Sequence, residues 1–216
     1  MEERLDALLL QLRSLWEEAT TIWFDGGWAM IAIAVVAIVI FAMGVHLHLV
    51  LRGKGFRSVP ERTWRRWIDE PSERRGPIGE LLDLVTGQRT LKENTATFRR
   101  LRAAETGPIA RDLRVMKICV SAAPLVGLLG TVTGMLATFG ALSTGSGGEE
   151  TMGLIAAGIS EALITTETGL VVAIPGLFLQ HQLSRKHDRY QAFLAHLESV
   201  CAQTLYRSLR RQRAAA

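Results

Sequence analysis

The chain contains few of the residues on which enzymes and disulfide-stabilised proteins usually depend. Its 216 residues include only two cysteines and five histidines. The cysteines, Cys119 and Cys201, fall in different segments, so we expect no structural disulfide. The histidines lack metal-ligand spacing, and no phosphate-binding loop, nucleophile elbow or paired acid/base site is present. The sequence therefore predicts a protein that is not an enzyme and has no cofactor.

Charged residues are also missing from long stretches of the chain. The uncharged runs Trp28 to Leu51 and Ile118 to Thr144 each exceed the roughly 20 helical residues that cross a bilayer. A third apolar stretch, about Gly153 to Leu183, contains two glutamates. We predict an all-α integral membrane protein with three transmembrane helices, long cytoplasmic helical extensions and an N-terminal amphipathic helix. The predicted segments are an outer-surface amphipathic helix (1–25), transmembrane helices (28–51, 116–142 and 153–183), a cytoplasmic helical loop (52–115), a periplasmic turn (143–152) and a cytoplasmic helical tail (184–216).

Basic residues are distributed unevenly around these spans. They are dense between the first two spans and after the third, whereas the N-terminal segment has only Arg4 and Arg13 and the 143–152 connection has none. By the positive-inside rule, the N-terminus and the short connection lie outside, and the long loop and the tail are cytoplasmic. This topology explains the basic pI of about 9.5 without nucleic-acid binding and favours contact with anionic lipid headgroups. Acids at the start of the chain indicate no cleaved signal peptide.

The segments outside the membrane are also predicted to be helical. Proline and glycine between residues 60 and 87 indicate several short helices in the loop. From Leu91 the second span is expected to begin inside the cytosol, with a kink at Gly107-Pro108. Apolar residues recur at helical spacing after the third span, from Tyr190 to Leu205. They predict a long tail helix that packs against the extension of the second span.

Small residues form a stripe along the second span. Gly127, Thr131, Gly134 and Thr138 fall at i, i+4, i+7 and i+11, and Gly130 and Gly134 have the spacing of a close-packing motif. Close packing is one interpretation of this stripe, and a hydroxyl-lined path is the other. The residues predicted to pack helices are Gly127, Gly130, Gly134, Thr138 and Pro175.

Two acids lie where lipid would otherwise be expected. In the third span Glu161, Thr165 and Thr168 share one helix face, whereas Thr166 and Glu167 point elsewhere. A carboxylate at the bilayer centre costs at least ~2.5 kcal/mol, so such residues usually face a bundle interior or an aqueous path. We infer that the two polar stripes line an ion path if they face each other. A structural acid bonded to neighbouring threonines is the alternative for Glu161, and it applies still more to Glu167.

Two segments resemble a known family. Ala123-Pro-Leu-Val-Gly-Leu-Leu-Gly-Thr-Val-Thr-Gly-Met135 and Gly158-Ile-Ser-Glu-Ala-Leu-Ile-Thr-Thr-Glu-Thr-Gly-Leu-Val-Val-Ala-Ile-Pro175 are similar to the MotA/TolQ/ExbB proton-channel family. The three-span layout resembles ExbB and TolQ rather than four-span MotA. The resemblance is specific over about residues 115 to 185, and elsewhere it is limited to the number and orientation of the spans.

The resemblance implies a proton-driven motor of the bacterial inner membrane. It implies a homopentamer around a dimer of single-span ExbD-like or TolR-like partners, which passes force to a TonB-like or TolA-like transducer. The family's acid corresponds to Glu161, and its threonines correspond to Thr131 and Thr166. Glu167 departs from the family pattern, which has a small or apolar residue there. With Thr165, these residues form the predicted ion pathway.

Several alternatives to this prediction remain open. The transported ion is expected to be H⁺, although the hydroxyl-rich stripes are compatible with Na⁺ because hard cations take oxygen ligands. The same ion-channel core could serve gliding, surface machinery or defence. A scaffold that conducts no ions and only clamps a single-span partner is a further alternative.

Overall fold

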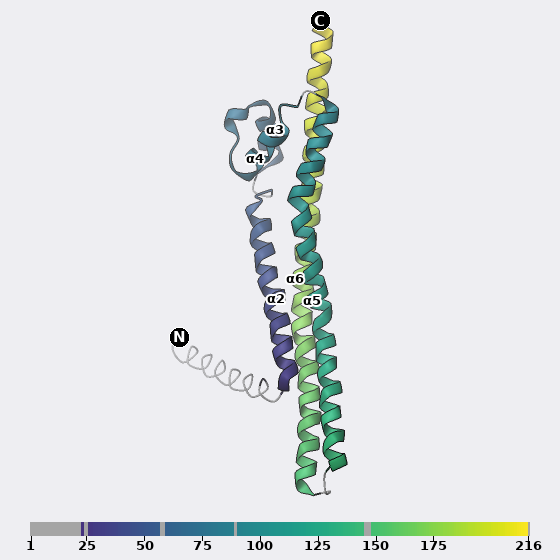
Figure 1. Ribbon diagram of the computed structural model, residues 1–216. Helices are drawn as coiled ribbons and strands as arrows, with labels where there is room; N and C mark the ends of the chain where they lie inside the picture. The colour runs from purple at the N-terminus through teal and green to yellow at the C-terminus, as the bar shows by residue number, and fades with distance from the viewer. Residues whose placement is uncertain (1–22, 24–25, 57–58, 89, 145–147, 216) are drawn as a thin grey trace, which may run out of the picture. The chain divides into compact units, whose positions relative to one another are not determined.

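The computed structural model describes Trp23 and residues 26–56, 59–88, 90–144 and 148–215. These residues form helices and turns, with no strand among them, which confirms the all-α fold class. The helices are α2 (Gly27–Gly53), α3 (Glu61–Asp69), the 3-10 helix η1 (Pro71–Glu73), α4 (Gly76–Val85), α5 (Leu91–Thr144) and α6 (Glu149–Ala215), as labelled in Figure 1. The amphipathic helix predicted at 1–25 falls, apart from Trp23, outside the described residues.

Within the described part of the chain, three helices are long and apolar enough to cross a membrane. Their most apolar windows have mean hydropathies of 2.7 in α2, 1.8 in α5 and 1.7 in α6. With 54 and 67 residues, α5 and α6 continue well past the roughly 20 residues that a bilayer needs. The expected kink at Gly107-Pro108 does not interrupt α5, which is helical through both residues.

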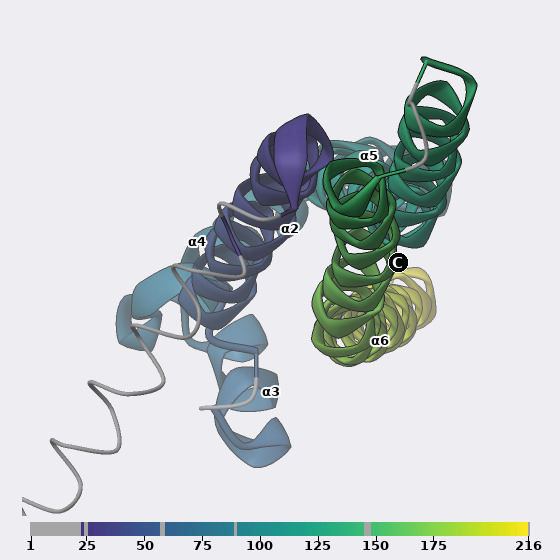
Figure 2. The same ribbon diagram turned by 90° about the horizontal axis from the view of Figure 1, so that it is seen from below.

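The chain divides into two compact units, and each long helix contributes a part to both. Unit 1 comprises residues 1–41 and 117–178, and unit 2 comprises residues 42–116 and 179–216. In unit 1 the α5 and α6 segments lie side by side, and the first part of α2 lies beside α6 (Figure 2). Gly176 of α6 makes this possible, because a Cβ there would lie only 3.1 Å from Ile40 of α2 and 3.2 Å from Val120 of α5.

Unit 2 has its own apolar core. Side chains from the short helices α3 and α4 are buried together with residues from the beginning of α5 and the tail of α6. Arg74 joins the two short helices, because its guanidinium donates to the Trp67 carbonyl at 2.7 Å and pairs with Asp83 at 2.7 Å. The core comprises Trp64, Trp67, Ile78, Leu82, Val85, Phe98, Leu197, Val200 and Cys201.

Candidate ion site in the membrane-spanning helices

Glu161 lies in the apolar part of α6, and its side chain is half-buried. The carboxylate is directed at the start of α2, where Gly27 has a φ of +61°. A Cβ added to Gly27 would lie 2.7 Å from Glu161 Cδ and closer still to Oε1. The carboxylate therefore occupies the space that any other residue at position 27 would need for its side chain.

Glu167 lies on a different side of α6. Its side chain is exposed, and the residues around it on the same helix face are exposed and apolar. These neighbours are Leu163, Leu170, Val171 and Ile174. A carboxylate on such a face is costly in contact with lipid, and Glu167 thus differs from the half-buried Glu161 in its surroundings.

The threonine hydroxyls are bonded to backbone carbonyls. Thr166 Oγ1 donates to the Gly127 carbonyl at 3.1 Å and so joins α6 to α5. Thr131 and Thr165 instead donate to carbonyls of their own helices, at 2.7 Å and 2.9 Å. Among the described residues, no hydrogen bond joins Glu161 to Thr131, Thr165 or Thr168. The two polar stripes therefore do not meet through Glu161 within one chain.

The stripe of small residues along α5 packs closely against α6. A Cβ on Gly127 would lie 2.8 Å from the Thr165 carbonyl oxygen, and one on Gly134 would lie 2.7 Å from the Gly158 carbonyl oxygen. Gly130 faces the side chain of Thr165, which is fully buried. Thr138, also buried, packs against Gly158. Backbones this close leave no room between the helices for larger side chains.

Sequence reasoning missed the α6 half of this contact. The buried residues of this half lie at helical spacing and comprise Gly158, Ala162, Thr165, Gly169 and Ala173. The repeat of small residues was a usable signal. Pro175, predicted to pack helices, is exposed, and the neighbouring Gly176 makes the close contact instead. No local sequence pattern identified Gly27, because its role depends on a contact with a residue far away in the sequence.

A polar network lies in unit 2, outside the membrane-spanning segments. Lys54 Nζ pairs with Glu105 Oε2, and the buried Tyr190 hydroxyl donates to the same oxygen at 2.8 Å. Burial alone raises the pKa of Glu105, but the hydrogen bonds from Lys54 and Tyr190 outweigh it and lower that pKa below its usual value. Burial, and then the bond to Glu105, raises the pKa of Tyr190 well above its ordinary range. The network ties the residues after α2 to α5 and α6.

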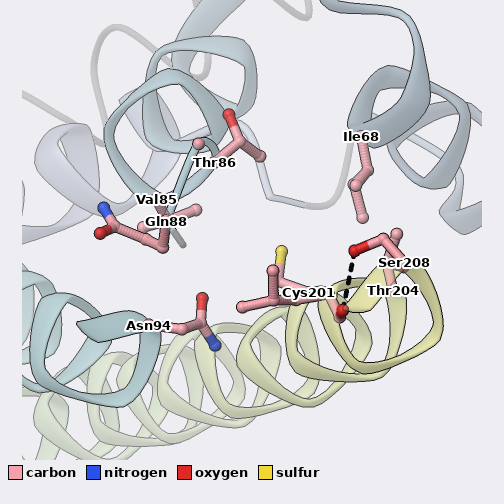
Figure 3. Close-up of a pocket in the computed structure, with 10 residues that line it drawn as sticks. Ile68, Val85, Thr86, Gln88, Asn94, Cys201, Thr204 and Ser208 are labelled. Carbon is pink, nitrogen blue, oxygen red and sulfur yellow. Dashed lines mark hydrogen bonds between the residues drawn. The ribbon is translucent and has the colours of Figure 1, made fainter. Parts of the chain in front are cut away.

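Unit 2 also contains a cavity of about 160 Å³ between the end of α4, the start of α5 and the tail of α6 (Figure 3). Asn94 of α5 and Cys201 of α6 both line it, across from Thr86 and Ile68. Burial raises the pKa of the Cys201 thiol to about 11, so it is neutral at physiological pH and a poor nucleophile. The described residues include no cluster of three or more His, Cys, Asp or Glu side chains able to bind a metal ion. None of the predicted ion-pathway residues lines this cavity.

Comparison with known proteins points to one family. The profile of the MotA/TolQ/ExbB proton channel family matches residues 81–195. The chain is similar to the Tol-Pal system protein TolQ of Pseudomonas aeruginosa, with 34% identity over 177 residues that cover 78% of this chain and 73% of that protein. It is also 34% identical over 146 residues to the putative biopolymer transport protein ExbB-like 1 of Synechocystis, covering 65% of this chain and 53% of the relative. The biopolymer transport protein ExbB of Helicobacter pylori is 41% identical over 80 residues, covering 37% of this chain and 54% of that protein. The chain thus spans about half the length of the last two relatives.

Proposed function

Because the chain belongs to the MotA/TolQ/ExbB proton channel family, we propose that it is an ExbB/TolQ-like subunit of a bacterial inner-membrane motor driven by the proton motive force. The subunit performs no covalent chemistry and is not an enzyme. Its N-terminus lies in the periplasm and its C-terminus in the cytoplasm, as the distribution of basic residues indicates.

The observation on which this proposal depends is the half-buried carboxylate of Glu161 within a membrane-spanning helix. An ionisable residue at such a position is expensive and is retained where it binds an ion or a proton. Glu161, Thr131, Thr166 and Glu167 are the residues to which we assign the ion path. Thr165 is fully buried against Gly130, so we assign it to helix packing and no longer to the path. The ion is H⁺, with Na⁺ as the alternative.

The complex that we propose is larger than this chain. Five copies would surround a dimer of single-span ExbD-like or TolR-like partners, which in turn drives a TonB-like or TolA-like transducer. The many large apolar side chains that α5 and α6 expose, such as Leu136, Phe139 and Phe178, support contact with lipid and with other membrane chains. The process that the motor drives would be outer-membrane transport or the maintenance of outer-membrane integrity. Gliding, surface machinery and defence are alternative processes that could use the same ion-channel core.

A second candidate function is a scaffold that conducts no ions and clamps a partner helix. It is favoured by the hydroxyls of Thr131, Thr165 and Thr168, all of which donate to carbonyls of their own helices. Hydroxyls satisfied in this way are compatible with packing alone.

Substitution of Glu161 separates the two functions. Glu161→Gln and Glu161→Ala should leave the complex assembled but reduce proton flux to background, because neither side chain ionises. Flux is measured with a pH-sensitive dye in membrane vesicles that contain the chain and its native single-span partner. Glu149→Gln removes an exposed acid at the start of α6 and serves as the control. Flux that is above background and unchanged in both Glu161 variants would contradict the proposed ion path. Flux already at background in the parent chain, with the partner still bound, would support the scaffold.

A further inference from the structure

The first turn of α2 is in contact with the acid of the proposed ion path. Gly27 is the first residue of α2, and an added Cβ would lie 2.7 Å from Glu161 Cδ and 3.5 Å from its Cγ. Real side chains do not approach this closely. Glycine is therefore the residue that permits the observed position of the Glu161 carboxylate.

The contact involves the carboxyl group of Glu161 itself. Glu161 comes from α6 and is half-buried, and the atom nearest the added Cβ is its Oε1. A side chain at position 27 would therefore displace the carboxyl group from its observed position.

We propose that Gly27 is a positioning residue for Glu161, because its missing side chain leaves the space that the carboxyl group occupies. The inference rests on the proposed function, because it assigns a docking place to the acid of the ion path. The first span thus takes part in the ion cycle through one glycine.

The test compares Gly27→Ala with a matched glycine. Gly76 has nearly the same backbone angle, a φ of +65° against +61° at Gly27, but an added Cβ at Gly76 has no atom within 4 Å. Both substitutions therefore impose the same backbone strain, and only Gly27→Ala displaces Glu161. Gly76 lies in unit 2, at the start of α4, and is not among the residues of the proposed ion path.

Two readouts are made on the full chain. The first is the rate at which dicyclohexylcarbodiimide modifies Glu161, followed by mass spectrometry with Glu167 as the internal reference, because this reagent attacks protonated carboxyl groups. Because Gly27→Ala displaces the carboxyl group of Glu161, it should change the rate of modification of Glu161 severalfold and leave that of Glu167 unchanged. The second readout is proton flux, which should fall by about 10- to 100-fold, as expected when a reacting group is misplaced by an ångström. Gly76→Ala should change neither.

A compensating change keeps the proposal falsifiable if Gly27→Ala merely folds poorly. Glu161→Asp shortens the side chain by one methylene and withdraws the carboxylate from the added methyl group. The double variant Gly27→Ala/Glu161→Asp should therefore conduct better than Gly27→Ala alone. Equal effects of Gly27→Ala and Gly76→Ala on labelling, or no recovery in the double variant, would overturn the inference. Normal flux in Glu161→Gln would instead overturn the proposed function, and the labelling rates would still report on Gly27.

Discussion

At the scale of single residues, the two acids of α6 have different surroundings. They are six positions apart, which places them about 120° apart around a helix with 100° per residue. Glu161 meets the start of α2, whereas Glu167 lies among exposed apolar side chains. A carboxylate contributes to ion transfer only where it can both gain and lose a proton, and that depends on what each acid faces. The position of the Glu161 carboxyl group is fixed by a second helix of its own chain, through the contact with Gly27.

Tyr190 offers a test of the unit 2 network at the same scale. The chain has only two tyrosines, so in Tyr206→Phe all tyrosinate absorbance comes from Tyr190. Burial and the bond to Glu105 raise the pKa of Tyr190. A pKa that is higher in the folded state stabilises the fold below about pH 10, the ordinary tyrosine value, and this stabilisation is lost as the pH rises further. An ultraviolet pH titration should therefore show no tyrosinate until the chain unfolds, whereas the denatured chain should titrate near pH ~10.

Glu105→Ala is the matching variant for this titration. It removes the acceptor of the Tyr190 hydroxyl, so tyrosinate should appear at a lower pH than in the parent chain. A folded Tyr206→Phe protein that forms tyrosinate reversibly near pH ~10 would contradict the burial and bonding of Tyr190.

At the scale of helices, the close packing between α5 and α6 predicts opposite outcomes for two glycines of the same helix. A Cβ on Gly130 would lie 2.6 Å from Thr165 Cβ, whereas one on Gly140 has no atom within 4 Å. Gly130→Ala should lower the free energy of unfolding by about 1–3 kcal/mol through overpacking. Gly140→Ala should be neutral or stabilise the chain by up to about 1 kcal/mol, the helix propensity gained over glycine. Thermal unfolding of the purified chain in detergent measures both.

A suppressor of Gly130→Ala tests the cause of the loss. Thr165→Ala removes Oγ1 and Cγ2, two of the atoms that the added methyl group would meet. The double variant Gly130→Ala/Thr165→Ala should therefore recover part of the stability. Equal stabilities of the Gly130 and Gly140 variants would refute the close contact at Gly130.

The sequence predicted the all-α class and the three long apolar helices, because hydropathy and length depend only on residue types along the chain. It also identified Gly127, Gly130, Gly134 and Thr138 as a stripe. The sequence did not predict which helix each face contacts, because periodicity shows which residues share a face but not which helix packs against it. Glu161 and Thr165 share a face by spacing, yet Thr165 packs on Gly130 and Glu161 on Gly27. The contact with Gly27 joins residues 134 positions apart, and no local pattern encodes it.

At the scale of the whole molecule, the charge distribution predicts the topology. Basic residues cluster in the loop before α5 and in the tail of α6, whereas residues 143–152 contain none. Single cysteines in a chain with Cys119→Ser and Cys201→Ser test this with a membrane-impermeant maleimide. Gly148→Cys and Glu80→Cys place the new thiols at exposed positions on opposite sides of the predicted membrane.

Sealed vesicles of both orientations give each thiol its own control. By the positive-inside rule, Gly148→Cys should react only in right-side-out vesicles and Glu80→Cys only in inside-out vesicles. The reversed pattern would place the long loop in the periplasm and refute the predicted orientation. It would also place Glu161 differently with respect to the proton gradient. Protons would then enter the path from the side of the loop, so the direction of force in the proposed motor depends on this result.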